Sequence, residues 1–592
     1  TTPSTTESQW RILRDTNDIV KRFSFKYRQF RHSLIGMIET HVMNRKVKLS
    51  QIVKYSLFML ALIQFSCQIS LLTRGVEYIV TDLTVDDTYY YLQPAWNFKK
   101  LGFVTFDGIH RTNGVQLLWF GIVVLLAMLV PSKTVLLYAT LVICFLLNSL
   151  CYLVIWQVGK RLRRPILSLF LAGLWSMQSF SRGTYSEGME NSLHAFVLWC
   201  AVWQILVVLM QAQNNRPVSY FGVAITLTLN AWTRFDAGLT SVVLYVYCIL
   251  MVIHYAKNNE TFWHKNTKSI FSSSVIGMLG FVLQLALYRA MDSSYLPVSG
   301  LVKSSVANLG WDGEFLKRLG AVAVLNLSGI FPWRFLLTLF VLVGVLNLMK
   351  ANSNSPALKA LQFLWRGLAA SWLLHHIIIV KTGVLGKGKV FNLYPWHNTP
   401  WIIFGIITIA LTVEFFTAIV DIKSLALRIC GCRPIKLVRI SKWGSVVSCF
   451  LIIMISGHLF LFRVKMPLRK DNLYSVRYRA ALWMAENLPV DEVYASWNAG
   501  QLGFFSDRTV INLDGLVNSV NYYNRVLQGP VLLEDYLREN QVRYVIDYTY
   551  GNRLYWQLIP YTDEEIPVEW ETKYVFPRAS GGEVIRVWEL LP

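Results

Sequence analysis

Charge is scarce in this sequence, and negative charge is the scarcest. Asp, Glu, Lys and Arg make up only 16% of the 592 residues, whereas 54% are hydrophobic. The 35 acidic residues are outnumbered by 57 basic ones, so the formal net charge is +22. The hydrophobic residues fall in blocks long enough to cross a bilayer, which takes about 20 residues each. This composition excludes an ordinary soluble globular protein.

Cysteine is missing from the C-terminal part of the chain. Residues 464–592 contain none, and all eight cysteines lie in or beside apolar segments. A disulfide framework is therefore not expected, even if that part lies in an oxidising compartment. No internal repeat or low-complexity tract is present. A cleavable signal is not expected either, because residues 1–50 are polar and basic.

The basic residues cluster between the apolar blocks. This placement indicates membrane topology and contact with anionic lipid headgroups, and it argues against a nucleic-acid partner. We expect residues 1–50 to form a cytoplasmic arm, followed by about eleven spans, with the C-terminus outside. The predicted spans are residues 52–73, 135–158, 165–180, 194–212, 217–233, 237–255, 270–291, 335–349, 358–380, 400–421 and 444–463.

One apolar stretch, residues 115–130, is not counted as a span. If it crossed the membrane, the basic segment KRLRRP (160–165) would lie outside, against the positive-inside rule. We therefore expect a juxtamembrane or re-entrant helix at 115–130.

The character of the chain changes after Arg463. RYRAALWMAENLP and LLEDYLREN have helical periodicity, whereas EVYASW, TVINL and VRYVIDY have the pattern of short strands. The predicted fold is a polytopic α-helical membrane protein with a soluble, extracytoplasmic C-terminal α/β domain. The predicted domains are the arm (1–50), the transmembrane domain (51–463) and the α/β domain (464–592).

Two adjacent carboxylates, Asp86 and Asp87, follow the first predicted span in VDDTYYYLQPAWNF. Charges beside lipid are costly and usually functional. Thr84 and Asp87 have capping-box spacing, which predicts a short interfacial helix whose dipole keeps the carboxylates ionised. An ionised carboxylate at the membrane rim can accept a proton from a hydroxyl group or bind a divalent metal. The alternative is a helix cap followed by an interfacial belt, Tyr89–Tyr91.

Two further polar clusters lie on the same predicted side. His110 and Arg111 belong to the loop FDGIHRTNGVQLLW, whose glycines permit tight turns that direct both side chains to the rim; the alternative is an ordinary turn. Glu187 and Glu190 in YSEGMEN either cap the following helix or contribute to a polar cavity, and the spacing favours the cap.

Basic residues on the outer side suit a phosphate group. Arg234 and Asp236, between two apolar runs, form either a structural ion pair or part of a polar cavity in which Arg binds phosphate. Lys303, in YLPVSGLVKSS, and His397, near aromatic residues in KTGVLGKGKVFNLYPWHNTPW, suit a phosphate on an isoprenoid tail. Simple headgroup contact is the alternative for each of them.

Together these motifs resemble the GT-C superfamily of integral membrane glycosyltransferases. The resemblance rests on VDDTYYYLQPAWNF, GFVTFDGIHRTNGVQLLW, GMEN, RFDAG and the stretch ASWNAGQLGFFSDRTVINLDGLVNS (495–519). Within the superfamily, the first loop is most similar to bacterial enzymes of the arabinofuranosyltransferase type. The resemblance implies a bacterial inner-membrane enzyme of cell-envelope polysaccharide synthesis, with a polyprenyl-phosphate sugar donor and a cavity at the extracytoplasmic face.

Residue roles follow from the resemblance. Asp86 is then the base that deprotonates the acceptor, which is a glycan, lipid or protein. Asp87 orients the acceptor or binds a divalent cation (Mg, Mn or Ca). The donor-phosphate residues are Arg234, Lys303, His397, Arg111 and His110, and the acceptor-binding residues are Tyr89, Glu190, Asp236, Trp497, Asn498 and Asp514. In the C-terminal domain Asp507, Asn512 and Asn518 are further candidates for sugar binding, with turn or core structure as their alternative role.

Two other classes of function remain open. A transporter or flippase of lipid-linked saccharide accounts for the spans and the basic rim, but it does not account for the C-terminal domain, and transporters commonly carry internal repeats. A non-catalytic glycan-binding subunit is compatible with every motif above.

Overall fold

The computed structural model describes most of the apolar blocks and most of the C-terminal domain. The described residues are 46–181, 185–214, 216–256, 260–305, 313, 315–317, 356–381, 399–419, 472–550, 553–554, 570–577 and 584–590. The chain forms two compact units, Thr1–Ser56 and Leu57–Pro592. The predicted domain limits at residues 50 and 463 stay predictions.

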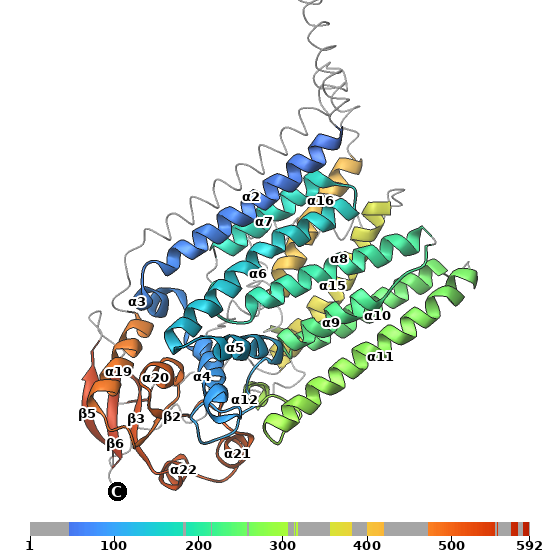
Figure 1. Cartoon of the computed structure of the whole chain (residues 1–592). Helices are drawn as coiled ribbons and strands as arrows, with labels where there is room; N and C mark the ends of the chain where they lie inside the picture. The colour runs from blue at the N-terminus through green and yellow to red at the C-terminus, as the bar shows by residue number, and fades with distance from the viewer. Residues whose placement is uncertain are drawn as a thin grey trace, which may run out of the picture. The chain divides into compact units, whose positions relative to one another are not determined.

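Helices dominate the part of the chain before residue 420 (Figure 1). They are α2 (Lys46–Leu72), α3 (Val76–Tyr78), η1 (Ile79–Leu83), α4 (Asp86–Leu101), α5 (Leu117–Leu129), α6 (Lys133–Arg161), α7 (Pro165–Ser181), α8 (Asn191–Gln213), α9 (Phe221–Thr233), α10 (Ala237–Ala256), α11 (Glu260–Met291), α12 (Val298–Ser305), α15 (Pro356–Lys381) and α16 (Thr399–Ile419).

The predicted spans correspond to helices wherever the structure describes them. Within the described residues, five helices are long and apolar enough to cross a membrane, namely Ser50–Leu72, Lys133–Arg161, Asn191–Gln213, Ala237–His254 and Asn266–Met291. The spans predicted at 335–349 and 444–463 lie outside the described residues. α9, at 13 residues, is shorter than the predicted span 217–233. Which ends of these helices lie outside stays a prediction.

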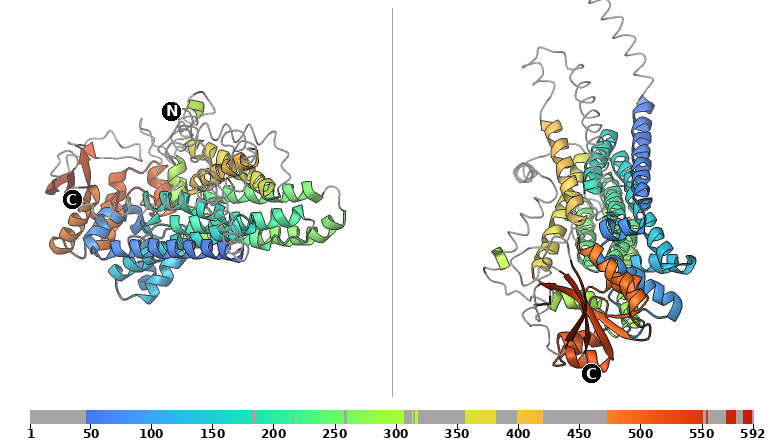
Figure 2. Two further views of the ribbon diagram at one scale, coloured as in Figure 1. Left: turned by 90° about the horizontal axis from the view of Figure 1, so that it is seen from above. Right: turned by 90° about the vertical axis from the view of Figure 1, so that its left-hand side faces the viewer.

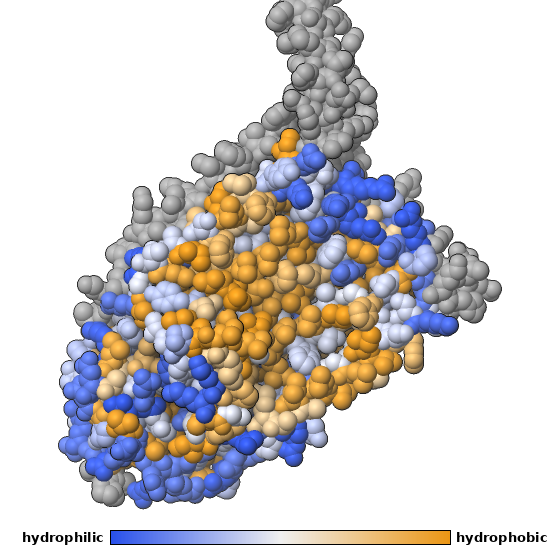
Figure 3. Space-filling model, in the orientation of Figure 1, coloured by the Kyte–Doolittle hydropathy of each residue, from blue (hydrophilic) through white to orange (hydrophobic). Residues whose placement is uncertain are grey.

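Apolar side chains cover the outer surface of the helices. Figure 3 shows a broad hydrophobic area over the helices, with hydrophilic residues gathered at both ends of it, one of them the end formed by the C-terminal domain. Leu125, Leu129, Val242, Leu279 and Val282 are all more than half exposed, as expected for side chains that face lipid. α5, which has 13 residues, is about 20 Å long and therefore shorter than a bilayer core. Its length agrees with the expected juxtamembrane helix at 115–130.

The C-terminal domain is built on a mixed six-stranded sheet. Its elements are α19 (Leu473–Asn487), β1 (Val493–Ser496), α20 (Gly500–Phe505), β2 (Thr509–Asn512), α21 (Val520–Tyr522), η4 (Tyr523–Leu527), α22 (Leu533–Glu539), β3 (Val542–Tyr550), β4 (Arg553–Leu554), β5 (Trp570–Phe576) and β6 (Val584–Leu590). The strand order is β2-β1-β3-β6-β5, and β4 pairs with β3. β1 is parallel to β2 and β3, whereas β6 is antiparallel to β3 and β5. The right-hand view of Figure 2 shows the twist of this sheet.

Both faces of the sheet are covered, because residues of each central strand alternate between two apolar clusters. Tyr494, Val510 and Ile546 belong to one cluster, which also contains Tyr90 of α4 and residues of α12 and α19. Ala495 and Ile511 belong to the other, on the side of α22. The helices and strands predicted in this domain are confirmed. Its first cluster is shared with α4 and α12, so the domain packs directly on these two helices.

A close approach of two loops leads to a test of this packing. A Cβ atom on Gly114, in the loop before α5, would lie too close to the carbonyl oxygen of Leu516, in the loop after β2. We expect Gly114→Ala to lower the free energy of unfolding by about 1–3 kcal/mol, because the two loops must separate. The matched control is Gly121→Ala on α5, where an added Cβ meets nothing within 4 Å. Thermal unfolding in detergent measures both, and equal midpoints would contradict the packing of these loops.

Candidate active site

α4 begins at the acidic pair, but not through the predicted capping box. The N-cap residue is Val85, and it makes no side-chain cap. The hydroxyl of Thr84 instead hydrogen-bonds the carbonyl oxygen of Ile79 at 3.0 Å and the hydroxyl of Tyr89 at 2.9 Å. The predicted helix start is therefore confirmed, whereas the predicted Thr84–Asp87 box is wrong.

A polar cavity lies beside one face of α4. Asp87, Tyr90 and Tyr91 line it, and their spacing of three and four residues places them on the same side of the helix. The other lining residues come from the loop before α5, the start of α8, the end of α9, α12 and the loop after β2: Gly114, Gln116, Met189, Glu190, Arg234, Ser299, Lys303 and Leu516. Motifs more than 400 residues apart in the chain thus meet at one site.

Asp87 is the carboxylate that this cavity exposes. Its side chain is half-buried, and within the described residues it has no hydrogen-bond partner. Desolvation by burial raises the pKa of Asp87 to about 6, and Asp86 and Glu190 add to the rise. Lys303 and Arg477 act in the opposite direction. The group is therefore ionised at neutral pH but readily protonated, as suits a general base.

An ion-pair network contributes Glu190 and Arg234 to the lining of the cavity. Arg234 donates from Nη1 to Glu190 Oε1 at 2.7 Å, and its Nε and Nη2 both bind the carboxylate of Asp236 at 3.0 Å. The hydroxyl of Tyr91 donates to Glu190 Oε2 at 2.8 Å. His375 of α15 lies 3.3 Å from Asp236. Glu190 occupies the N-cap position of α8, as the favoured prediction has it, but its side chain makes no cap bond and pairs with Arg234 instead.

Lys303 is the second cation at the cavity. It lies one turn after Ser299 on α12, and both residues line the cavity. Arg234 already binds two carboxylates, whereas Lys303 has no ion pair with any described residue. Lys303 is therefore better placed than Arg234 to bind an incoming phosphate. The third predicted phosphate ligand, His397, lies outside the described residues.

Asp86 does not line the cavity. It is 5% exposed, and its carboxylate accepts hydrogen bonds from the backbone N–H groups of Gly500 and Gln501 at 3.0 and 2.9 Å. Arg477 of α19 forms an ion pair with it at 2.9 Å. Three donors thus hold this carboxylate inside the protein. The predicted role of Asp86 as the base stays a prediction.

Other predicted residues also lie away from the cavity. His110 hydrogen-bonds Asp107 at 2.7 Å, and Arg111 is exposed beside the ring of Phe103. Tyr89 is fully buried, with Phe504 as a neighbour. None of these three residues lines the cavity, and their predicted roles stay predictions.

The C-terminal domain contributes to the cavity in another way than predicted. Trp497 is 2% exposed and belongs to the core of the sheet, so it offers no stacking surface, and the backbone N–H of half-buried Asn498 faces Asp547. Asp236, the acceptor-binding candidate in the membrane helices, is bound by the guanidinium group of Arg234. Asp514, by contrast, accepts a hydrogen bond from Tyr90 at 2.6 Å.

Asp514 therefore lies directly behind the cavity wall, where burial raises its pKa to about 7. Asn512 and Asn518 are buried in the same turn, where the side-chain amide of Asn518 donates to the carbonyl oxygen of Asn512. Asp507 forms an ion pair with Lys133.

A resident metal ion has little support from the described donor set. The two carboxylates that line the cavity are Asp87 and Glu190, and Glu190 is bound to Arg234 and Tyr91. Across the described ranges no group of three or more His, Cys, Asp or Glu side chains is arranged to hold a metal. The predicted cation at Asp87 therefore stays a prediction.

Several residues of the site were not foreseen. The sequence assigned Tyr90 and Tyr91 only to the alternative of an interfacial belt, although their spacing from Asp87 places them on its face of the helix. Arg477 and His375 contact the site from segments that carry no recognisable motif, so no local signal identifies them.

Comparisons with known proteins identify the fold. Two solved structures of ArnT from Cupriavidus metallidurans match most of the chain. The one bound to undecaprenyl phosphate is 12% identical with a TM-score of 0.52, covering 90% of this chain and 97% of that chain. The apo structure is 13% identical with a TM-score of 0.50, covering 89% and 97%. The chain has the GT-C fold.

Sequence comparisons add less. A family model described as "Domain of unknown function (DUF8728)" matches residues 470–588, which is the C-terminal domain alone. No curated protein matches the sequence. The GT-C resemblance predicted from the motifs is thus confirmed at the level of the fold.

The two cations of the cavity are expected to differ in structural importance. Arg234→Met leaves the buried Glu190 without its partner, which we expect to cost roughly 3–5 kcal/mol of unfolding free energy. Lys303→Met removes a half-buried charge without an ion pair and should change stability by less than about 0.5 kcal/mol. Unfolding in detergent compares the two variants. A similar loss in both would show that Lys303 is also structural.

Proposed function

We propose that this protein is a membrane glycosyltransferase that moves a sugar from a polyprenyl-phosphate donor to an acceptor hydroxyl, with Asp87 as the base. The observation that carries the proposal is Asp87, a carboxylate that the described residues leave without a hydrogen-bond partner, in the same cavity as the cation Lys303, within the fold of ArnT. The role that the motifs assigned to Asp86 thus passes to its neighbour.

The proposed reaction needs few groups. The acceptor oxygen attacks the anomeric carbon, the bond from that carbon to the phosphate oxygen breaks, and the acceptor proton passes to the carboxylate of Asp87. The polyprenyl phosphate leaves with the electron pair of the broken bond. A phosphate is already a good leaving group, so a base and a cation that stabilises phosphate charge suffice. Lys303 supplies that cation, and the Glu190–Arg234–Asp236 network keeps the wall of the cavity in place. No step requires a metal ion.

The donor lipid has its own support. The matching ArnT structure is bound to undecaprenyl phosphate, and the similarity covers most of both chains. The apolar surface of the helices is consistent with a site at the membrane interface. We place the protein in a bacterial inner membrane with the cavity on the extracytoplasmic side, as the positive-inside rule predicts.

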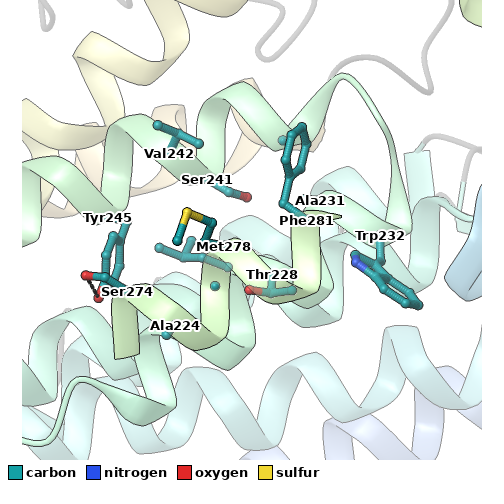
Figure 4. Close-up of a pocket in the computed structure, with 13 residues that line it drawn as sticks. Ala224, Thr228, Ala231, Trp232, Ser241, Val242, Tyr245, Ser274, Met278 and Phe281 are labelled. Atoms are coloured by element: carbon teal, nitrogen blue, oxygen red, sulfur yellow. Dashed lines mark hydrogen bonds between the residues drawn. The ribbon is translucent and has the colours of Figure 1, made fainter. Parts of the chain in front are cut away.

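A second, apolar cavity suits the tail of such a lipid. It lies between α9, α10 and α11 and has a volume of about 360 Å³, within the range of small-molecule sites. Figure 4 shows Thr228, Ser241, Met278 and Phe281 projecting into it from the three helices. Met278 is 63% exposed, so the cavity opens on the lipid-facing side of α11.

Some residues that line the apolar cavity are neighbours in the sequence of residues at the polar site. Trp232 and Gly238 line the apolar cavity, and Arg234 and Asp236 lie between them. At its other end the hydroxyl groups of Tyr245 and Ser274 hydrogen-bond at 3.1 Å. We propose that the isoprenoid tail of the donor occupies this cavity while its phosphate lies at Lys303.

Asp87→Asn is the first test. Loss of the base should lower the transfer rate about 10²- to 10⁴-fold, because the carboxamide cannot accept the acceptor proton. In the unchanged protein, kcat/KM should fall as the pH drops through about 6, since the pKa of Asp87 is raised to that value and the protonated form is inactive. Transfer from a purified polyprenyl-phosphate sugar measures both effects.

Asp82→Asn is the matched control, because Asp82 lies in η1, outside the cavity. Normal transfer by Asp87→Asn would exclude Asp87 as the base. Donor binding without any transfer in the unchanged protein would favour a flippase or a binding subunit.

Gly277→Leu tests the tail site. An added Cβ would meet Thr228 Oγ1 at 3.8 Å, an ordinary contact, so a side chain fits there and fills the cavity. We expect KM for a long-chain donor to rise about tenfold, which corresponds to about 1.4 kcal/mol of lost binding. KM for a short-chain donor should not change. Gly121→Leu, on α5, is the control, and an equal change for both donors would indicate a cavity filled by bulk lipid.

A further inference from the structure

The first turn of α4 is held by the C-terminal domain. All three donors to the carboxylate of Asp86 belong to that domain: Arg477 in α19, and the N–H groups of Gly500 and Gln501 at the start of α20. The side chain of Gln501 also donates to the carbonyl oxygen of Val80, just before α4, at 3.1 Å. Arg477 is 4% exposed, so this ion pair is shielded from solvent.

This attachment controls the residue that follows. Asp87 is bonded to Asp86 through one peptide unit, and it shares a helix face with Tyr90 and Tyr91. Tyr90 is tied to Asp514 of the C-terminal domain, and Tyr91 to Glu190 of the membrane helices. The rotation of α4 about its axis is therefore fixed from both sides, and Asp86 fixes the turn that carries Asp87.

We propose that Arg477 is a positioning residue that acts through Asp86: docking of the C-terminal domain sets the orientation of Asp87 for proton transfer. The inference rests on the proposed function, since it takes Asp87 to be the base. It assigns the C-terminal domain a part in the chemistry in addition to any part in acceptor binding.

Gly500 shows how close the contact is. A Cβ atom at this position would lie too near the backbone carbonyl oxygen of Asp86, and also 2.9 Å from its carboxyl carbon. Only glycine allows α20 to approach α4 so closely. Gly500→Ala therefore displaces Asp86 without removing a charge. This variant separates the effect of the position of Asp86 from the effect of its charge.

The charges around Asp87 make a positioning role distinguishable from a merely structural ion pair. Lys303 on α12 and Arg477 on α19 lower the pKa of Asp87, whereas Asp86 and Glu190 raise it. Asp514, in the loop after β2, is a further negative group close enough to Asp87 for the two charges to interact. Loss of the charge of Asp86 and loss of the charge of Arg477 must therefore move the titration of Asp87 in opposite directions.

The experiment uses the full-length protein in detergent with a polyprenyl-phosphate sugar as donor. We expect Asp86→Asn and Arg477→Gln each to lower kcat about 10- to 100-fold, the effect of a small displacement of a reacting group, with donor KM nearly unchanged. The acid limb of the pH profile, where kcat/KM falls as Asp87 becomes protonated, should move to lower pH in Asp86→Asn and to higher pH in Arg477→Gln. Gly500→Ala should lower kcat and leave the limb in place.

Two further variants complete the series. Arg477→Lys keeps the charge, so it should leave the limb near its normal position and recover part of kcat. Arg525→Gln removes an arginine of the same domain that pairs with Glu539 at the surface, and it should change nothing. Arg477→Lys and Gly500→Ala keep every charge and therefore test the inference if Arg477→Gln does not fold.

The possible results separate the two proposals. Absence of transfer by the unchanged protein would overturn the proposed function. Normal transfer by the unchanged protein together with normal kcat in Asp86→Asn, Arg477→Gln and Gly500→Ala would overturn only the positioning role. A third result is that kcat falls only in proportion to the amount of folded protein, and that the acid limb does not move in Asp86→Asn or Arg477→Gln. This result would also overturn the positioning role and leave the Asp86–Arg477 ion pair as a structural contact.

Discussion

The structure depends on the cost of burying a carboxylate, and on the donors that meet this cost at Asp86. An ionised carboxylate away from water must be paired and hydrogen-bonded, or it is strongly destabilising. At Asp86 every donor comes from the C-terminal domain, so the charge that starts α4 also ties that domain to the membrane helices. Glu190 is treated in the same way by Arg234 and Tyr91. The one carboxylate of the cavity that the described residues leave without such a partner is Asp87, and for this reason it is available for chemistry.

Apolar periodicity predicted much of this architecture. The spans were visible because lipid requires about 20 apolar residues per crossing, and the described helices begin and end near the predicted limits. The alternation of β1, β2 and β3 identified the sheet domain, because both of its faces are buried. Sheet order and the packing of the domain on α4 had no local signal, since they depend on contacts such as Gly500 with Asp86 across more than 400 residues.

The site could be predicted in part. The motifs directed attention to Asp87, Glu190, Arg234 and Lys303, which meet at one cavity. They did not separate Asp86 from Asp87, because adjacent carboxylates are equivalent in sequence and differ only in their partners. The sequence could not assign Trp497 for a related reason. An aromatic side chain suits a sugar-binding surface and a sheet core equally well, and only the fold shows that Trp497 lies in the core. Buried arginines such as Arg477 are not distinguished from topology signals by composition.

The loop after β2 has a consequence for the order in which the protein matures. Leu516 completes the wall of a cavity whose first residue is Asp87, and Asp514 holds Tyr90 from behind. During synthesis the ribosome releases α4 long before it reaches these residues. A nascent chain that has inserted all of its membrane helices therefore still lacks one wall of the cavity. Only a chain that has been made past Leu516 contains every described residue of the cavity, so shorter products in the membrane cannot form it.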